Sequence, residues 1–196
     1  MKRYLWGVAT GVIVMLVVPL VVAVTGVVNM GASTKPSALE KNLATLAVNA
    51  SMYWRTPAEQ NPAAGDNKAR SDGLAHFSEM CVRCHGAPGV ERQEFAKGLN
   101  PPAPPLDHAR KAFSDAELFW ITKNGIRMTA MPAFGATHND GDIWKIVEAV
   151  KALGDLTPDE KDRLKNEGQE LEGHHHAADT GGGENELKHG HAEQNN

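Results

Sequence analysis

Two cysteines and a histidine form the stretch of this sequence whose spacing suggests a specific chemistry. The stretch is Cys81-Val82-Arg83-Cys84-His85. Two thiols two residues apart at the end of a helix can each form a thioether with one of the neighbouring vinyl groups of a haem, and the histidine then lies under the iron. We therefore predict one covalent haem c, bound through Cys81 and Cys84, with His85 as an axial ligand of the iron.

Other uses of the pair explain less. These are the only two cysteines in the chain. A structural zinc site takes four protein ligands, and no second cysteine pair is present to complete one. A thioredoxin-like pair occurs in a βαβ setting, and no segment here has a strand pattern. A disulfide between Cys81 and Cys84 is chemically possible but would leave the rest of the chain unexplained.

The N-terminus predicts a membrane anchor. Lys2 and Arg3 precede twenty-five uncharged residues, Tyr4 to Val28. About twenty apolar residues span a bilayer as a helix, whereas a cleaved signal peptide has a shorter apolar region and a small-residue cleavage site. The sequence around Ala32 is a poor cleavage site. We expect residues 1–31 to be a retained anchor, with Lys2 and Arg3 in the cytoplasm and the haem outside it.

Residues 32–66 predict a short helix and a linker. Ser37 to Glu40 form a capping box, and Leu39, Leu43, Leu46 and Ala50 follow at helical spacing. Tyr53 and Trp54 lie near the end. Such a helix can lie on the membrane or a partner, or it can pack on the domain that follows; the pattern does not separate these interpretations. Thr56 to Asp66 is typical of a linker.

Residues 67–154 predict a small all-α domain. Leu74, Phe77 and Cys81 share one helical face, Ser114 opens a second helix that Asn124-Gly125 ends, and Asn139 opens a third that carries Trp144. Between them, the proline-rich stretch 100–106 must be extended. One of its carbonyls is a suitable acceptor for the Nδ1 proton of His85. About ninety residues make a small core, which a haem would complete.

The order of these features resembles the class I, monohaem cytochrome c domain over Gly73 to Leu153. Gly73 and Phe77 precede the Cys81/Cys84/His85 motif as in that family, and Met131-Pro132 precedes a last helix with an aromatic residue, Trp144. The apolar segment before it is similar to membrane-anchored bacterial cytochromes c. The resemblance implies His85 and Met131 as axial ligands, a crossing of the Gly73 and Trp144 helices, and electron transfer. It does not cover residues 37–54 or the C-terminal tail.

The second axial ligand also has to be weighed among the residues themselves. Met131 is favoured because Pro132 stiffens the loop, while Met128 in the same loop is its main rival. Met80 and His76 precede the attachment site on its own helix and are on the wrong side of the chain. His108, His138 or an open position complete the alternatives, and either methionine can simply fill space in a core.

The C-terminal residues 155–196 predict an acidic, histidine-rich, disordered tail. They hold eleven acidic and four basic residues, while the whole chain has a net charge of -4. We expect a short solvated helix to begin at Thr157. The tail histidines can bind a divalent metal; a solvated tail without that role is the alternative. No basic stripe points to nucleic acid.

We therefore expect a membrane-anchored electron carrier rather than an enzyme, with no small-molecule substrate. It would lie in a bacterial inner membrane as a single-pass protein, with its haem in the periplasm and redox proteins of the membrane as partners, either as a free shuttle or as a subunit of a larger complex. The alternatives are a haem-based gas sensor or peroxidase-like enzyme with a labile sixth ligand, and a metal-handling protein that acts through its tail.

Overall fold

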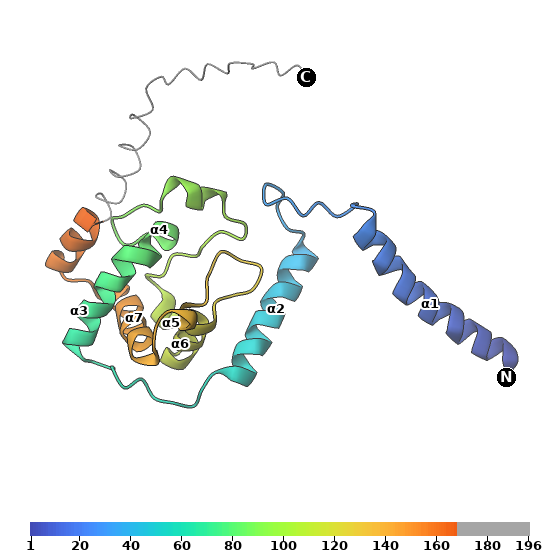
Figure 1. The fold of residues 1–196 in the computed structure, drawn as a ribbon, viewed down its shortest axis with the longest axis horizontal. Coiled ribbons are helices and arrows are strands. Elements are labelled where there is room, and N and C mark those ends of the chain that lie inside the picture. The colour runs from blue at the N-terminus through green and yellow to red at the C-terminus, as the bar shows by residue number, and fades with distance from the viewer. Residues whose placement is uncertain (168–196) are drawn as a thin grey trace, which may run out of the picture. The chain divides into compact units, whose positions relative to one another are not determined.

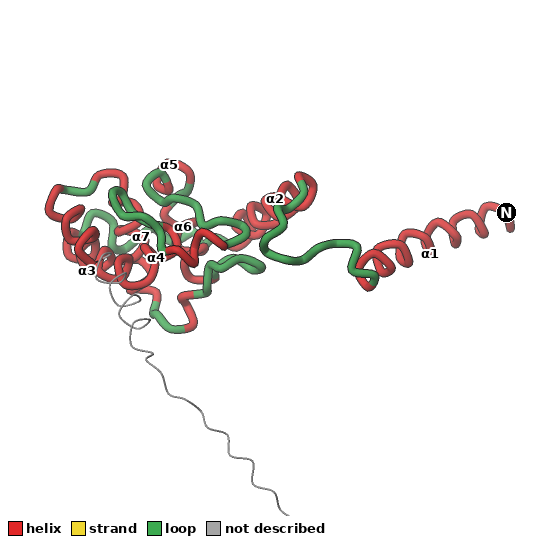
Figure 2. Tube along the Cα trace, turned by 90° about the horizontal axis from the view of Figure 1, so that it is seen from above, coloured by secondary structure: helices red, strands yellow, loops and turns green. Residues whose placement is uncertain are grey.

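A computed structural model describes residues 1–167 of the chain. Its longer helices are α1 (Lys2–Val24), α2 (Ala38–Arg55), α3 (Asn67–His76), α6 (Asp115–Asn124) and α7 (Asp140–Ala152); the short ones are η1 (Phe77–Cys81), α4 (Val82–His85), η2 (Glu94–Gly98), α5 (Ala109–Ala112), η3 (Phe134–Ala136) and η4 (Leu153–Asp155). Residues 158–167 are also helical. Within this part of the chain helices and loops account for the fold, and no strand is present (Figures 1 and 2). The all-α prediction is confirmed.

The chain divides into two units, residues 1–45 and the residues from Leu46 onward, so that α2 begins in one unit and ends in the other. In the first unit, α1 is long and apolar enough to cross a membrane, with a mean hydropathy of 2.7. None of its residues is buried against the rest of the protein. A signal sequence near an N-terminus has the same properties.

The predicted capping interactions at the helix starts are present in the structure. The Glu40 amide donates to Ser37 Oγ, and the Ser37 amide donates back to the Glu40 carboxylate. Ser114 and Glu117 form the same reciprocal pair at the start of α6, and the Asn139 side chain accepts from the Asp142 amide at the start of α7. Each pair satisfies backbone amides that have no partner inside the helix.

The second unit is built around the crossing of α3 and α7. A Cβ atom at Gly73 would lie 2.6 Å from the carbonyl carbon of Lys145 and would overlap its oxygen, so only glycine lets the two backbones come this close. Phe77 and Ile143 are fully buried beside the crossing, and Phe119 of α6 stacks on Trp144 of α7 with ring centroids 4.1 Å apart. The expected crossing of the Gly73 and Trp144 helices is confirmed.

A buried carboxylate holds the segment before α3. Glu148, 8% exposed, accepts from Asn61 Nδ2 at 2.6 Å, from the Gly65 amide at 3.1 Å and from Lys151 Nζ at 2.8 Å. Asn61 and Lys151 also donate to Asp115 on α6. The carboxylate is therefore fully hydrogen-bonded, as a buried charge must be. The last part of the segment that we expected to be a linker is bound to the domain.

The helix that follows α7 is not solvated as we expected. Leu156 is 7% exposed and Leu164 is 2% exposed, and both belong to the same apolar core as Phe77 and Trp144. The residues between these two leucines are mostly charged. Composition alone therefore did not show that Leu156 and Leu164 belong to the core. The packing continues past the boundary that we placed at residue 154. The predicted disordered tail began at residue 155, but residues 158–167 are helical; the rest of that tail, residues 168–196, lies outside the described part of the chain.

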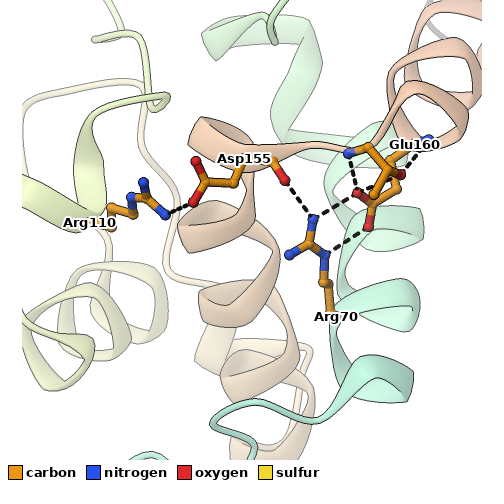
Figure 3. Close-up of polar contacts among 5 residues, drawn as sticks. Arg70, Arg110, Asp155 and Glu160 are labelled. Carbon is orange, nitrogen blue, oxygen red and sulfur yellow. Dashed lines mark hydrogen bonds and ion pairs between the residues drawn. The ribbon is translucent and has the colours of Figure 1, made fainter.

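An ion pair fastens this last helix to α3. Arg70 donates from Nε and Nη2 to the two carboxylate oxygens of Glu160, both at 2.7 Å, and Nη2 also donates to the Asp155 carbonyl at 3.1 Å (Figure 3). Arg110 pairs with the Asp155 side chain beside it. The hydrogen bond from Arg70 is the main cause that lowers the pKa of Glu160 to about 2, and the Thr157 amide and hydroxyl lower it further.

We predict that replacing Gly73 with alanine destabilises the haem-loaded protein by about 1–3 kcal/mol, because the added methyl group pushes α3 away from α7. The free energy of unfolding, followed by the haem absorbance in denaturant, measures this. Gly98→Ala is the control, since a Cβ at Gly98 would meet nothing within 4 Å. Equal stability of the two variants would show that the crossing tolerates a side chain.

We predict that Glu160→Gln lowers the free energy of unfolding at neutral pH by about 1–2 kcal/mol. The folded protein holds the pKa of Glu160 at about 2, below its ordinary value of 4.5. Its contribution is therefore complete above pH 4.5 and is lost as the pH falls from 4.5 towards 2. Unfolding measured at pH 7, 4 and 3 should show the gap between wild type and variant closing. Asp159→Asn, at the exposed neighbouring position, is the control; a gap that does not change with pH would contradict the assignment.

Candidate haem site

The two cysteines and the histidine lie at the end of one continuous helical run, from α3 through η1 to α4. The run widens into a single π-helical stretch at Phe77–Cys81, where the Val82 amide donates to the Phe77 carbonyl. It ends at Gly86, whose φ of 68° is unfavourable for other residues. A Cβ there would lie 2.8 Å from the Val90 carbonyl oxygen. The turn after His85 is therefore tight and depends on glycine.

The two cysteines are not joined by a disulfide, and their surroundings are unequal. Cys81 is 9% exposed and Cys84 is half-buried. Burial, and to a lesser extent the neighbouring Cys84, raise the pKa of Cys81 to about 12. A thiol with this pKa is protonated at neutral pH, whereas redox-active CxxC cysteines have lowered pKa values. The environment of Cys81 therefore argues against a thioredoxin-like role.

His85 is held in the tautomer that an iron ligand needs. Its Nδ1 donates to the Pro104 carbonyl oxygen at 2.7 Å. Burial lowers the pKa of His85, with the Pro104 hydrogen bond acting in the opposite direction and Arg92 lowering it slightly. The neutral ring with its proton on Nδ1 leaves the lone pair of Nε2 free for a metal. The expected hydrogen bond from His85 to the proline-rich loop is present, and its acceptor is the Pro104 carbonyl.

A cavity of about 550 Å³ opens beside His85. Its apolar wall includes Ala87, Val90, Leu106 and Leu153. Ala87, Val90 and Leu106 are only partly buried and pack against the apolar core. The charged lining residues are balanced in sign: Glu91, Arg92, Lys97 and Asp107. An apolar wall next to an imidazole with a free Nε2 suits a mostly apolar ligand that carries a metal.

Met131 lies in the loop after α6, apart from the helix that carries the cysteines. Gly125 ends α6 with a φ of 65°, and a Cβ there would lie 2.6 Å from the Pro132 carbonyl carbon and 2.7 Å from the Met131 oxygen. The loop closes on itself where the Ile126 amide donates to the Met131 carbonyl and the Met131 amide donates to Thr129 Oγ1. The missing side chain of Gly125 therefore lets the backbone of Met131 lie close to the end of α6.

The other candidates for the second axial position differ from Met131 in their surroundings. Met128 is 79% exposed, with a φ of 61°, while Met131 is half-buried. His76 and His138 contact each other, with ring centroids 5.6 Å apart. His108 is largely exposed beside Asp107, and Met80 packs against the apolar core. The assignment of Met131 to the iron stays a prediction.

Residues 68–148 match the family described as cytochrome C oxidase, cbb3-type, subunit III. These residues form a monohaem cytochrome c domain. The match contains the helix with both cysteines, the loop that bears Pro104 and the loop that bears Met131, so the domain carries one covalently bound haem c and serves haem-based electron transfer. No curated protein and no solved structure matches the chain.

The side chains present fit a haem c. His85 has its Nε2 available, the two thiols are not paired with each other, and the cavity beside His85 has an apolar wall. Sequence reasoning proposed the cysteines, the histidine and the methionine, but it did not identify Pro104 among the prolines or the contact of Gly125 with the methionine loop. In the sequence, Asn124-Gly125 indicated only the end of a helix. The contact of Gly125 with the backbone of Met131 and Pro132 depends on how the loop folds.

We predict that Gly125→Ala displaces the methionine loop. The substitution adds both backbone strain, about 1 kcal/mol for a non-glycine residue at positive φ, and a clash with Met131 and Pro132. Gly89→Ala is the matched control, since Gly89 has a φ of 85° but a Cβ there meets nothing within 4 Å. Carbon monoxide should bind the reduced Gly125→Ala protein readily and the reduced control poorly. Identical behaviour of the two variants would show that the clash does not reach the iron.

Proposed function

We propose that this protein is a membrane-anchored carrier of single electrons. Cys81 and Cys84 bind the haem covalently, and His85 and Met131 are the axial ligands. The observation that carries the proposal is the hydrogen bond from His85 Nδ1 to the Pro104 carbonyl, 2.7 Å long, which prepares the imidazole to bind a metal through Nε2.

The bound haem supplies a one-electron iron couple, and the chain sets its properties. His85 keeps its ring orientation through Pro104, and Met131 offers a soft, neutral thioether that favours ferrous iron. A histidine and methionine pair raises the reduction potential relative to other ligand sets. If His85 and Met131 both held the iron, they would leave no position on it for a substrate, and the haem would serve electron transfer rather than catalysis or gas sensing.

The proposed anchor is α1. Its 23 residues would be about 35 Å long, enough for a hydrocarbon core of about 30 Å. Lys2 and Arg3 precede the apolar run, so the positive-inside rule puts them in the cytoplasm and the haem domain in the periplasm. The run exceeds the length of a signal-peptide core, which favours retention of the helix.

The partners we propose are redox proteins in or at the same membrane. The matched family is named for a subunit of an oxidase, which supports a place in a respiratory or dehydrogenase chain, as a shuttle or as a subunit. No small-molecule substrate is required for this role.

We predict that Met131→His keeps a six-coordinate, low-spin haem but lowers its potential by more than about 60 mV, the shift that corresponds to a tenfold change in the ligand's preference between the two oxidation states. Met131→Ala should open the position, so that the reduced protein binds carbon monoxide readily. Redox titration and absorbance spectra measure both effects. Met128→Leu is the control and should resemble wild type, because Met128 is exposed.

The wild-type protein itself distinguishes the carrier from the alternative functions. Reduced wild type should bind carbon monoxide poorly. Fast and tight binding would mean a labile sixth ligand and would replace the carrier proposal with a gas sensor or peroxidase-like enzyme.

A further inference from the structure

Helix α2 carries an apolar stripe that the protein leaves exposed. At 100° per residue its members fall within an arc of about 100°, and they are Leu39, Leu43, Leu46, Ala50, Tyr53 and Trp54. The large side chains among them are between 56% and 78% exposed. No charged residue lies within the arc, which extends about 22 Å along the helix. A contiguous apolar surface of this kind marks a binding surface.

The opposite face of the same helix carries the residues of α2 that the protein buries. Met52 is 5% exposed and Val48 is half-buried, and both lie about half a turn away from the stripe. In its last part the helix therefore has a buried side, while the stripe faces the surroundings. This arrangement answers the question that the sequence left open: packing on the protein and binding something else are both possible, on different faces.

We propose that this stripe lies in the membrane–water interface, as a second membrane contact beside α1. The inference rests on the proposed anchoring of α1. Only residues 25–37 separate the end of α1 from the start of α2, so α2 begins at most about 50 Å from the end of the span. A helix with one apolar face can sink that face into the boundary between headgroups and acyl chains.

The composition of the stripe suits lipid. Tyr53 and Trp54 close it as an edge-to-face pair with ring centroids 5.1 Å apart, and these two residue types are enriched at membrane interfaces. Its flanks on one side are the uncharged Asn42 and Asn49. The other flank holds Ala47 and a single charged residue, Glu40. A helix that pairs with a second helix normally carries charged flanking residues that select its partner. The stripe therefore lacks the repeated charged flanks of a helix pair, which favours lipid over a second copy of the chain.

The experiment reads the lipid contact of Trp54 directly. The full haem-loaded chain, with Trp6→Phe to remove the tryptophan of α1, is reconstituted into phosphatidylcholine vesicles and into vesicles of the dibrominated lipid. Bromine quenches tryptophan fluorescence on contact. The same protein with Trp54→Phe gives the contribution of the remaining tryptophans, and the difference is the signal of Trp54. Quenching by haem is the same in both lipids and cancels in the ratio.

The matched variants add the same charge to two sides of α2. Leu43→Glu with Leu46→Glu disrupts the stripe, and Ala44→Glu with Thr45→Glu, the control, places two carboxylates on exposed positions away from it. We expect the Trp54 signal to fall at least twofold in brominated lipid for the parent and for the control variant, and not to fall for the leucine-site variant. A carbonate wash of each vesicle preparation reports anchoring by α1 independently.

Two results would overturn the proposal while leaving the anchor intact. One is an unquenched Trp54 in a chain that resists carbonate. The other is quenching that survives Leu43→Glu with Leu46→Glu, which would mean that the stripe is not the contact. Release of the parent chain by carbonate would instead remove the anchor on which the inference rests, and with it this proposal.

Discussion

The close approach of two backbones at Gly73 is the constraint on which the haem domain depends. Because α3 meets the Lys145 carbonyl region of α7 without a side chain between them, the helical run that starts at α3 is fixed in direction before it reaches its end. That end carries the cysteines and His85. The crossing also sets the position of Trp144, on which Phe119 of α6 stacks. One glycine therefore orients both the helix that binds the cofactor and the helix that precedes the methionine loop.

The site itself is assembled from a rigid helix end and two loops that backbone groups hold in place. The loop before α5 contributes a carbonyl, that of Pro104, and not a side chain. The loop after α6 begins at Gly125, whose missing side chain lets the backbone of Met131 and Pro132 fold against it. Neither loop has regular secondary structure. Their positions therefore depend on a well-packed core beneath them. The Arg70 pair with Glu160 and the burial of Leu164 add to that core from the C-terminal side.

What could be predicted from the sequence is what local chemistry determines. The capping boxes at Ser37 and Ser114 and the helix stop at Gly125 act over a few residues, and each has its expected form in the structure. The cysteine motif is equally local, and the role of its residues as the attachment site stays a prediction. The failures concern residues whose role depends on distant partners. Leu164 sits among charged neighbours and is buried because it joins the apolar core to which Phe77 and Trp144 belong. Asn61 lies in a stretch with the composition of a linker, yet Glu148, 87 residues away, binds it.

The hydrogen bonds of Asn61 and Gly65 shorten the possible linker between the haem domain and the membrane anchor that we propose for α1. Had residues 56–66 been a free linker, the haem domain would have been tethered by that stretch as well as by residues 25–37. Their hydrogen bonds to Glu148 hold residues 61–65 on the domain, and Met52 near the end of α2 is buried. The stretch after α2 that could act as a linker is thereby shortened to residues 56–60. If α1 is the membrane anchor that we propose, a shorter connection raises the effective concentration of the domain at a membrane partner, since effective concentration falls steeply with the length of a linker that can already span the distance. For a protein that passes electrons over short distances, that gain comes from hydrogen bonds far from the haem.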